Sequence, residues 1–473
     1  MACVAALPIL AAGCSFTPAP VHPVPPVPAQ YAGTDADAPS IARIGWQDFF
    51  RDPELRRLIA TALDQNRDLR SAAARVDEAR GAWRIEGAPL YPSLDAAAGG
   101  TRGRARLDLP KLGTLDYDVK QVTAQLSAGW EIDFWGRLHA LNQAARDTYL
   151  ATEAARRAVA TDLVAQVANG YLLEREYGER VALAARTIET REQSLHILQR
   201  RYDVGSGSRL EVTQAETLLG QAQVAMEALV QDRAVNRNAL ALLVGQPVTI
   251  AEGPLALAAT AAPVDLPVGL PSELLVDRPD IVAAEYRLRA AEANIGAARA
   301  AFLPNIALTG AFGWASTDLE GLFDHGSQVW SFSPQIRLPL FNAGRLKANL
   351  DVTRARQIGA VAQYEKAIQG AFRDVSDALV RRQQLARQIS ATEAVRDTLR
   401  ERARLAQLRF DNGRSAYLEV LDAQRALFDT DQALVQLRRA HLASGVALYA
   451  ALGGGFAPAL PAQHNPQSQG EAR

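Results

Sequence analysis

The sequence predicts an α+β protein built from two copies of one unit, in which a pair of strands precedes a very long helix. The first observation is a duplication: RFDNGRSAYLEVLDAQ, which begins at Arg409, matches RYDVGSGSRLEVTQAE, which begins at Arg201, at a constant offset of 208 positions. The second is a change from helical to strand periodicity within each copy. The third is a proline-free run of 67 residues from Gly136 to Tyr202, repeated from Gly344 to Phe410. A duplication of this length is the first feature to explain.

Composition excludes several classes of protein. The chain has 51 basic and 52 acidic residues, so its charge does not favour nucleic acid as a partner. Both cysteines, Cys3 and Cys14, lie near the N-terminus, which excludes a disulfide or a thiolate metal site in the rest of the chain. The six histidines are scattered, and neither a nucleophile elbow nor a phosphate-binding glycine loop occurs. We therefore expect no enzymatic activity, no metal and no cofactor.

The N-terminus has the features of a secretory leader. Residues 1–13 form a short apolar stretch that ends in small residues directly before Cys14, and we assign them as a signal peptide. The order LAAGC resembles a bacterial lipobox, with Ala11 where leucine is favoured, and this implies lipidation of Cys14. An ordinary cleaved leader with an incidental cysteine is the alternative. Residues 14–40 are then a lipidated N-terminus followed by a proline-rich extended tether.

Helical spacing of apolar and alanine residues predicts a helix over Pro53–Glu86, with Asp52 as its N-cap, and a matching helix over Asp280–Ala301. Here the offset is 212, so the second copy lacks four residues between Pro304 and Gly344. The resulting segments are a first repeat at 41–252, a linker rich in proline and alanine at 253–271, a second repeat at 272–453 and a flexible tail at 454–473.

Strict alternation of apolar and polar residues predicts strands over Val122–Phe134 and Trp330–Leu340, and weaker alternation follows Pro92 and Pro304. Each copy thus supplies a strand pair. Strands of about 10 residues match the length that crosses a bilayer, although the edge of a soluble sandwich would alternate in the same way. Aromatic residues near the strand ends favour the membrane, since they are typical of interfacial girdles: Tyr91, Trp130, Trp135, Trp314 and Trp330.

The segments 102–118 and 316–327 are polar, and we expect them to be loops outside the membrane. Four strands cannot close a barrel, and lipid does not tolerate an open sheet edge. Several chains must therefore share one barrel, although this reasoning does not fix their number.

Each long helix is expected to reverse through a turn and return, over Leu210–Gly245 and Leu418–Gly453. At 1.5 Å per residue, a helix of about 66 residues is roughly 100 Å long, which suggests coiled-coil packing. Gly205 and Gly413 lie in the two turns, where we expect them to have positive φ.

Four sequence motifs resemble those of the TolC-type outer-membrane factors: LPSELLVDRPDI at 270–281, FLPNI at 302–306, FNAGRL at 341–346, and RFDNG followed by YLEVLDAQ within 409–424. The leader points to the lipoprotein branch that serves resistance-nodulation-division pumps. The resemblance implies a homotrimer with a twelve-stranded barrel in the outer-membrane lipid, continuous with a helical coiled-coil barrel in the periplasm. It also implies a passive duct that opens when a periplasmic adaptor and an inner-membrane pump dock.

The same resemblance implies a periplasmic gate formed by Glu419 and Asp422, and docking of the adaptor at the hairpin tips beside Gly205 and Gly413. Three copies of Asp422 around an axis would form an acidic ring. The plainer alternative is that these acids are helix-end charges in solvent. Ser415 stands where some members carry a bracing arginine.

Two other functions share parts of this pattern. A periplasmic coiled-coil adaptor or scaffold would have the long helices but no need of lipid-facing strands. A conduit for type I protein secretion would have the same fold, and we rank it below efflux because of the lipobox and the DRPDI wording.

Overall fold

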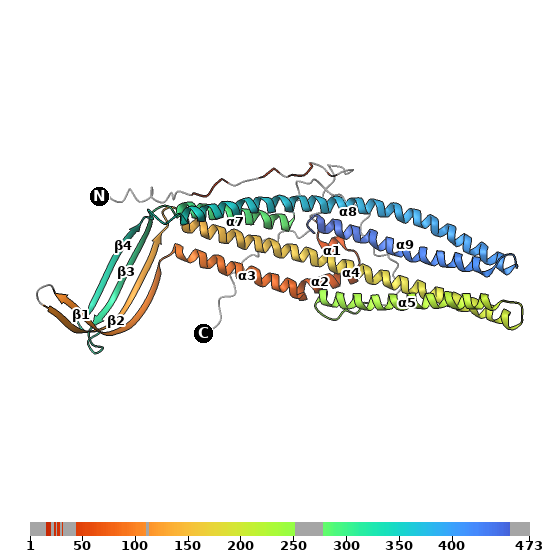
Figure 1. Ribbon diagram of the computed structural model, residues 1–473, viewed down its shortest axis with the longest axis horizontal. Coiled ribbons are helices and arrows are strands. Elements are labelled where there is room, and N and C mark those ends of the chain that lie inside the picture. Colours follow the sequence, from red (N-terminus) through yellow and green to blue (C-terminus); the bar gives the residue numbers. More distant parts are fainter. Residues whose placement is uncertain are drawn as a thin grey trace. The chain divides into compact units, whose positions relative to one another are not determined.

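The computed structural model describes residues 16–19, 23–24, 26–28, 31, 44–109, 113–250 and 278–454. The chain divides into two compact units: one contains Arg75–Glu153 and Ala283–Glu365 with the first N-terminal residues, and the other contains Ala154–Val282 and Lys366–Arg473 with Pro25–Ala74. The first unit holds the strands and the second holds the helical hairpins (Figure 1). Cys14, the signal peptide and the linker at 253–271 lie outside the described residues, as does the tail beyond Gly454.

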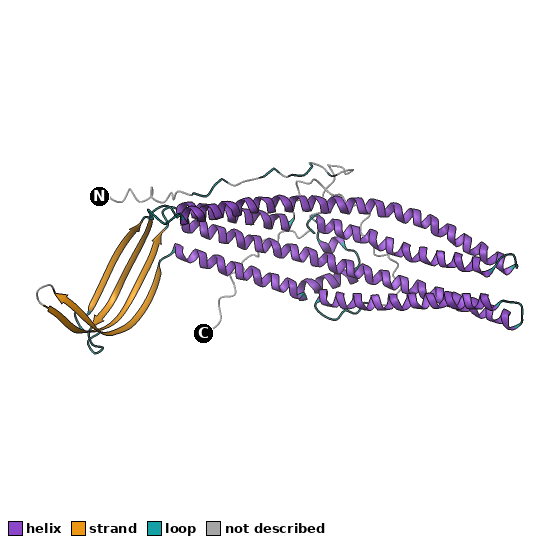
Figure 2. Cartoon of the chain, viewed as in Figure 1, coloured by secondary structure: helices purple, strands orange, loops and turns teal. Residues whose placement is uncertain are grey.

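The strands form one antiparallel sheet in the order β1-β2-β3-β4. They are β1 (Ser93–Leu109), β2 (Gly113–Ile132), β3 (Asn305–Ser316) and β4 (Gln328–Arg337), coloured orange in Figure 2. Each repeat contributes one hairpin, and the two hairpins meet where β2 pairs with β3. The predicted strand pairs are thus confirmed, although β2 and β4 end before Phe134 and Leu340.

The register places apolar residues in continuous rows across the sheet. Leu126 of β2 pairs with Phe312 of β3, which pairs with Trp330 of β4. Paired residues share a face, so this row is apolar from strand to strand. It is also exposed, since these three side chains are 48%, 50% and 78% accessible. The sheet therefore carries an uncovered apolar face of the kind that lipid covers.

The expectation of a loop over 102–118 was wrong. Strands β1 and β2 continue through most of this segment as a two-stranded ribbon beyond the last residue paired with β3, Val122. Its charged residues are paired across the strands: Arg104 lies opposite Asp118 at 3.2 Å, and Arg106 lies opposite Asp116 at 2.7 Å. The polar composition indicated a loop, but the same charged residues can form ion pairs across the two strands of a hairpin.

The helix predicted over Pro53–Glu86 is interrupted. It consists of α2 (Pro53–Gln65) and α3 (Arg67–Gly87), with extended backbone at Asn66 between them. Asp52 caps α2 as predicted, and its side chain accepts hydrogen bonds from the backbone of Glu54 and Leu55. The Asn66 side chain accepts from Leu69 N at 2.9 Å and so caps α3. Asn66 breaks the helix because its amide replaces the missing backbone partners. Two short helices complete this part: α1 (Trp46–Phe49) and a 3-10 turn at Ala88–Leu90.

The long helices predicted from the proline-free runs are confirmed: α4 (Arg137–Asp203) and α8 (Arg345–Asp411) each have 67 residues. They reverse into α5 (Arg209–Val244) and α9 (Tyr417–Ala451), so each repeat ends in a helical hairpin, while α7 (Pro279–Ala300) precedes β3 (Figure 1). Among the described residues, no helix combines the length and the apolar character that crossing a membrane requires.

The return helices of the two repeats end on equivalent contacts. The Asn66 side chain donates to the carbonyl of Leu243 at 2.9 Å, and Arg278 donates to the carbonyl of Ala451 at 3.0 Å. The offset of 212 relates Asn66 to Arg278, and the offset of 208 relates Leu243 to Ala451. The last carbonyls of a helix lack intrahelical partners, so both contacts satisfy groups that would otherwise be orphaned.

Candidate gate at the hairpin tips

The two hairpin turns have the same backbone geometry. Gly205 has φ +75° and Gly413 has φ +67°, in the left-handed region that favours glycine, which confirms the expected turn conformation. Ser206 N donates to Arg201 O at 2.8 Å, and Arg414 N donates to Arg409 O at the same distance. In neither turn would a Cβ on the glycine meet another atom within 4 Å. The glycines are therefore required by backbone conformation and leave the tips open.

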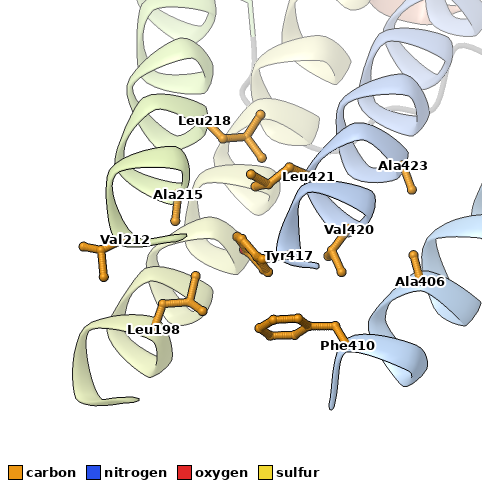
Figure 3. Close-up of a cluster of buried hydrophobic side chains, with 10 residues drawn as sticks. All are labelled: Leu198, Val212, Ala215, Leu218, Ala406, Phe410, Tyr417, Val420, Leu421 and Ala423. Carbon is orange, nitrogen blue, oxygen red and sulfur yellow. The ribbon is translucent and has the colours of Figure 1, made fainter. Parts of the chain in front are cut away.

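A cluster of buried side chains joins the two tips (Figure 3). Phe410 and Tyr417, at the end of α8 and the start of α9, point toward one another with ring centroids 5.0 Å apart. The guanidinium of Arg201, from the end of α4, lies 4.9 Å from the centre of the Phe410 ring. The cluster comprises Leu198, Val212, Ala215, Leu218, Ala406, Phe410, Tyr417, Val420, Leu421 and Ala423. Since burial of each large side chain contributes roughly 1.5–3 kcal/mol, the cluster holds the hairpins of one chain together at their tips.

The two return helices begin differently. Helix α5 begins with a capping box, in which the Ser208 side chain accepts from Leu210 N and the Glu211 side chain accepts from Ser208 N. The N-cap of helix α9 is Ala416, whose side chain cannot accept a capping hydrogen bond. Glu419, the counterpart of Glu211, lies instead 3.5 Å from Arg409 of α8. A carboxylate that caps its own helix in the first repeat is thus free to pair with the neighbouring helix in the second.

Asp422 is held by two arginines. The guanidinium of Arg402 on α8 donates a hydrogen bond to one carboxylate oxygen, and Arg425 of α9 donates to the other at 3.3 Å. The hydrogen bond from Arg402 is the main cause that holds the pKa of Asp422 below its usual value. The Asp422 and Arg402 side chains are 45% and 52% exposed, so solvent screens the pair. Asp422 is therefore an ionised acid that is already paired within its own chain.

These charges line a groove of about 660 Å³ between the hairpins. Gln214, Thr217 and Gln221 of α5 face Glu419 and Asp422 of α9 across it. Gln214 is the counterpart of Asp422 in the first repeat, so one wall is neutral and the other is charged. The groove can bind water, ions or a polar helix face.

The structure thus brings the two predicted gate acids to one side of a groove, but their arginine partners were missed. The spacing of three residues between Asp422 and Arg425 is a sequence signal that could have revealed one of them. No signal links Arg402 to Asp422, because their contact depends on how α9 returns along α8. The Ser415 side-chain oxygen is buried without a hydrogen-bond partner. The described residues contain no group of three or more His, Cys, Asp or Glu side chains that could hold a metal ion.

The predicted girdle residues lie at opposite ends of the sheet. Tyr91, Trp130 and Trp135 lie where β1 begins and β2 ends, whereas Trp314 and Trp330 lie where β3 ends and β4 begins. Trp130 donates to Leu90 O at 3.2 Å, and Trp135 donates to Pro304 O at 2.9 Å. Tyr91 is 73% and Trp330 is 78% exposed. Two belts on either side of an apolar band are the arrangement that membrane interfaces favour.

The exposed apolar face of the sheet and the paired long hairpins define a channel-forming protein of the outer membrane. A family model described as outer membrane efflux protein matches residues 58–246 and 270–454. Among curated relatives, the solvent efflux pump outer membrane protein SrpC of Pseudomonas putida is 42% identical over 95% of this chain and 97% of its own. The probable outer membrane lipoprotein SilC of Salmonella typhimurium is 39% identical over 94% of this chain and 96% of its own.

Solved structures agree. The open-state MtrE outer membrane channel of Neisseria gonorrhoeae superposes with a TM-score of 0.86 at 37% identity, over 93% of this chain and 98% of that one. The chain therefore belongs to the outer membrane efflux protein family. It is an outer-membrane channel component with the fold of that family, and its relatives are efflux channels.

Proposed function

We propose that the chain is one subunit of a homotrimeric exit duct of a tripartite efflux system. The gate of this duct lies at its periplasmic tip and contains Glu419 and Asp422. The observation that carries the proposal is the four-stranded sheet, which has an exposed apolar face and two edges, β1 and β4. Lipid does not tolerate open edges, so β1 of one subunit pairs with β4 of the next. Three chains then close a barrel of twelve strands.

The partners of the tip are a periplasmic adaptor and an inner-membrane pump of the resistance-nodulation-division type. Side chains beside the tip glycines support docking there: Val204, Leu210 and Leu418 are 76%, 64% and 58% exposed. Leu210 and Leu418 are related by the offset of 208, so the hairpins present the same apolar residue twice. Exposed apolar side chains at equivalent positions suit a partner that contacts both hairpins alike.

The cargo is a class of small toxic solutes. The relatives are named for the efflux of solvents and toluene and, in CusC of Escherichia coli, of cations. A passive duct takes its selectivity from the pump that feeds it, which agrees with the variety of solutes named for relatives of similar identity. Lipidation of Cys14 is part of the proposal and is supported by the lipoprotein name of SilC.

The test is complementation of a host that lacks its own exit duct but expresses the pump and adaptor of this system. We expect the chain to lower accumulation of a fluorescent dye and to raise solvent tolerance, without secreting a protein substrate of a type I system. Replacing Leu210 and Leu418 together by aspartate should abolish dye export while the protein remains in the outer membrane. Export of the protein substrate without any effect on dye would overturn the proposal in favour of secretion.

A further inference from the structure

The first described residues of the chain contact helix α7. The ring of Phe16 lies 6.5 Å from that of Trp135, and the Arg299 side chain donates a hydrogen bond to Phe16 O at 3.2 Å. Thr17 lies against Gly296: a Cβ at Gly296 would be 2.6 Å from Thr17 Oγ1 and 3.0 Å from Thr17 Cα. Any larger residue at position 296 would therefore displace this backbone.

The platform under these residues is itself fixed. Trp135 donates to Pro304 O at 2.9 Å, and its ring packs edge-on against Phe134 with centroids 4.8 Å apart. Trp135 follows the last residue of β2, Ile132, and Pro304 directly precedes β3. Trp135, Gly296 and Arg299, which we call the cradle, therefore lie at this end of the sheet.

The cradle occurs once per chain. The offset of 212 relates Gly296 to Arg84 and Arg299 to Gly87, and the offset of 208 relates Trp135 to Ala343. In the other repeat the position equivalent to Gly296 is therefore occupied by an exposed arginine of α3, and the positions equivalent to Arg299 and Trp135 are occupied by glycine and alanine. The duplicated half offers no second site of this kind, so the contact is specific to one face of the molecule.

A second residue of the N-terminal segment is also packed. Tyr31 is 3% exposed, and its ring stacks on Phe372 of α8 at 5.0 Å with an interplanar angle of 15°. Where it is described at these residues, the proline-rich segment is bound to the protein surface, which a free tether would not be.

We propose that the cradle is a docking site for the residues that follow the acylated cysteine, and that it holds the lipid at the end of strand β2. The proposal rests on the proposed acylation of Cys14. Cys14 is two residues from Phe16, and two residues span at most about 7 Å. The acyl chains therefore enter the leaflet beside the sheet, next to the aromatic belt of Tyr91, Trp130 and Trp135.

The test is the mobility of a nitroxide at Ala19, an exposed residue just beyond the contact. The full-length protein carries Cys3→Ser and Ala19→Cys, so an acylated Cys14 leaves one free thiol. We expect a slow-motion spectrum, and its conversion to a mobile spectrum by Gly296→Leu, because leucine occupies the place of Thr17. Gly81→Leu is the matched control, since a Cβ on Gly81 of α3 meets nothing within 4 Å.

A mobile label in the parent protein would overturn the proposal, as would a Gly296→Leu spectrum no different from that of the parent or of Gly81→Leu. Acylation is read separately from the protein without Ala19→Cys, which should take up no label. Uptake of label by that protein would contradict the acylation of Cys14 but not the docking of the segment. Docking would then be measured in the Cys14→Ser background, where the same contrast between Gly296→Leu and Gly81→Leu decides it.

Discussion

Asp422 and Arg402 give the tip a property that an isolated acidic residue lacks. In each chain the carboxylate of α9 is bonded to a guanidinium of α8, and Arg425 contacts it from the other side. A trimer that places Asp422 near its axis would therefore present paired charges in this conformation. Separating α9 from α8 would expose the acids, so the field at the tip depends on the state of the hairpin.

We expect Arg402→Ala to raise the cation preference of channels in planar bilayers and Asp422→Asn to lower it, because each change removes one charge of the Arg402–Asp422 pair. Conductance of the closed state should rise in both, since both lose this ion pair between α8 and α9. Arg425→Ala is the control: it removes a neighbouring arginine of the same carboxylate but leaves that link. Unchanged selectivity in both Arg402→Ala and Asp422→Asn would exclude a role for this pair in the gate.

The same pair predicts a pH dependence. The pKa of Asp422 is lowered from 3.8, chiefly by the hydrogen bond from Arg402, so the bridge is complete above that value. It is lost as the pH falls through the lowered pKa, when the carboxyl group becomes protonated. Closed-state conductance should therefore rise only below pH 3.8 in the parent. If Asp422 controls that rise, Asp422→Asn should remove the step.

At the scale of elements, the two repeats use different residues to bond the last carbonyls of their return helices. Asn66, which precedes α3, donates to a carbonyl at the end of α5, and Arg278, which precedes α7, donates to one at the end of α9. Arg278 adds ion pairs with Asp280 at 2.6 Å and Asp374 at 3.4 Å. Burial alone would lower its pKa, but the two acids hold the pKa of Arg278 above its usual value. The second repeat is thus fastened by charge, and the first by a neutral amide.

We expect Arg278→Ala to destabilise the protein by about 2–3 kcal/mol, because it removes a largely buried guanidinium and leaves two partly exposed acids and a carbonyl without their partner. Asn66→Ala should cost about 1–2 kcal/mol, since only neutral hydrogen bonds are lost. Thermal unfolding of the detergent-solubilised protein, followed by circular dichroism, measures both. Arg373→Ala is the matched control: it contacts the same Asp374 at 2.7 Å but is 71% exposed, so its loss should have little effect. Equal losses for Arg278 and Arg373 would contradict the role of burial.

At the scale of the whole molecule, the sheet is incomplete in one chain. Strands β2 and β3 are paired on both sides, whereas β1 and β4 are its edges. Natural proteins protect edges by charge, bulges or covering elements, and β4 instead exposes Trp330, Phe332 and Ile336 at 78%, 61% and 71%. An edge strand of this kind is stable in lipid only when another strand completes its hydrogen bonds.

Cysteine pairs that join β1 to β4 should therefore cross-link between subunits and yield trimers on denaturing gels. The register between chains is not fixed by one chain, so a series is required: Ala96, Ala97 and Ala98 against Ser331 and Ser333. The control is Thr123→Cys with Ala315→Cys, which face each other on β2 and β3 within one chain. This control should cross-link without changing the apparent mass. Only monomers in the whole series, beside an efficient control, would exclude a shared barrel.

Much of the fold followed from local pattern. The duplication, the strand pairs and the two long helices were predicted, and the bounds of the long helices were predicted within a few residues, since periodicity reports directly on which face of an element is apolar. The errors concern polar residues, on which hydrophobic periodicity is silent. Cross-strand ion pairs stabilise the charged ribbon of β1 and β2, and the Asn66 side chain both caps α3 and bonds the end of α5.

The sequence by itself determined the elements, their order and the two acids of the second hairpin, because composition and spacing act over a few residues. Only the tertiary structure decided what those acids contact. Arg402 is 20 positions before Asp422, and α9 must return along α8 to bring them together. Likewise, no local sequence pattern singles out Gly296, yet Thr17, which is far from it in the sequence, packs against it. Contacts of this kind depend on the packing of whole elements, and packing is fixed only when all of them are in place.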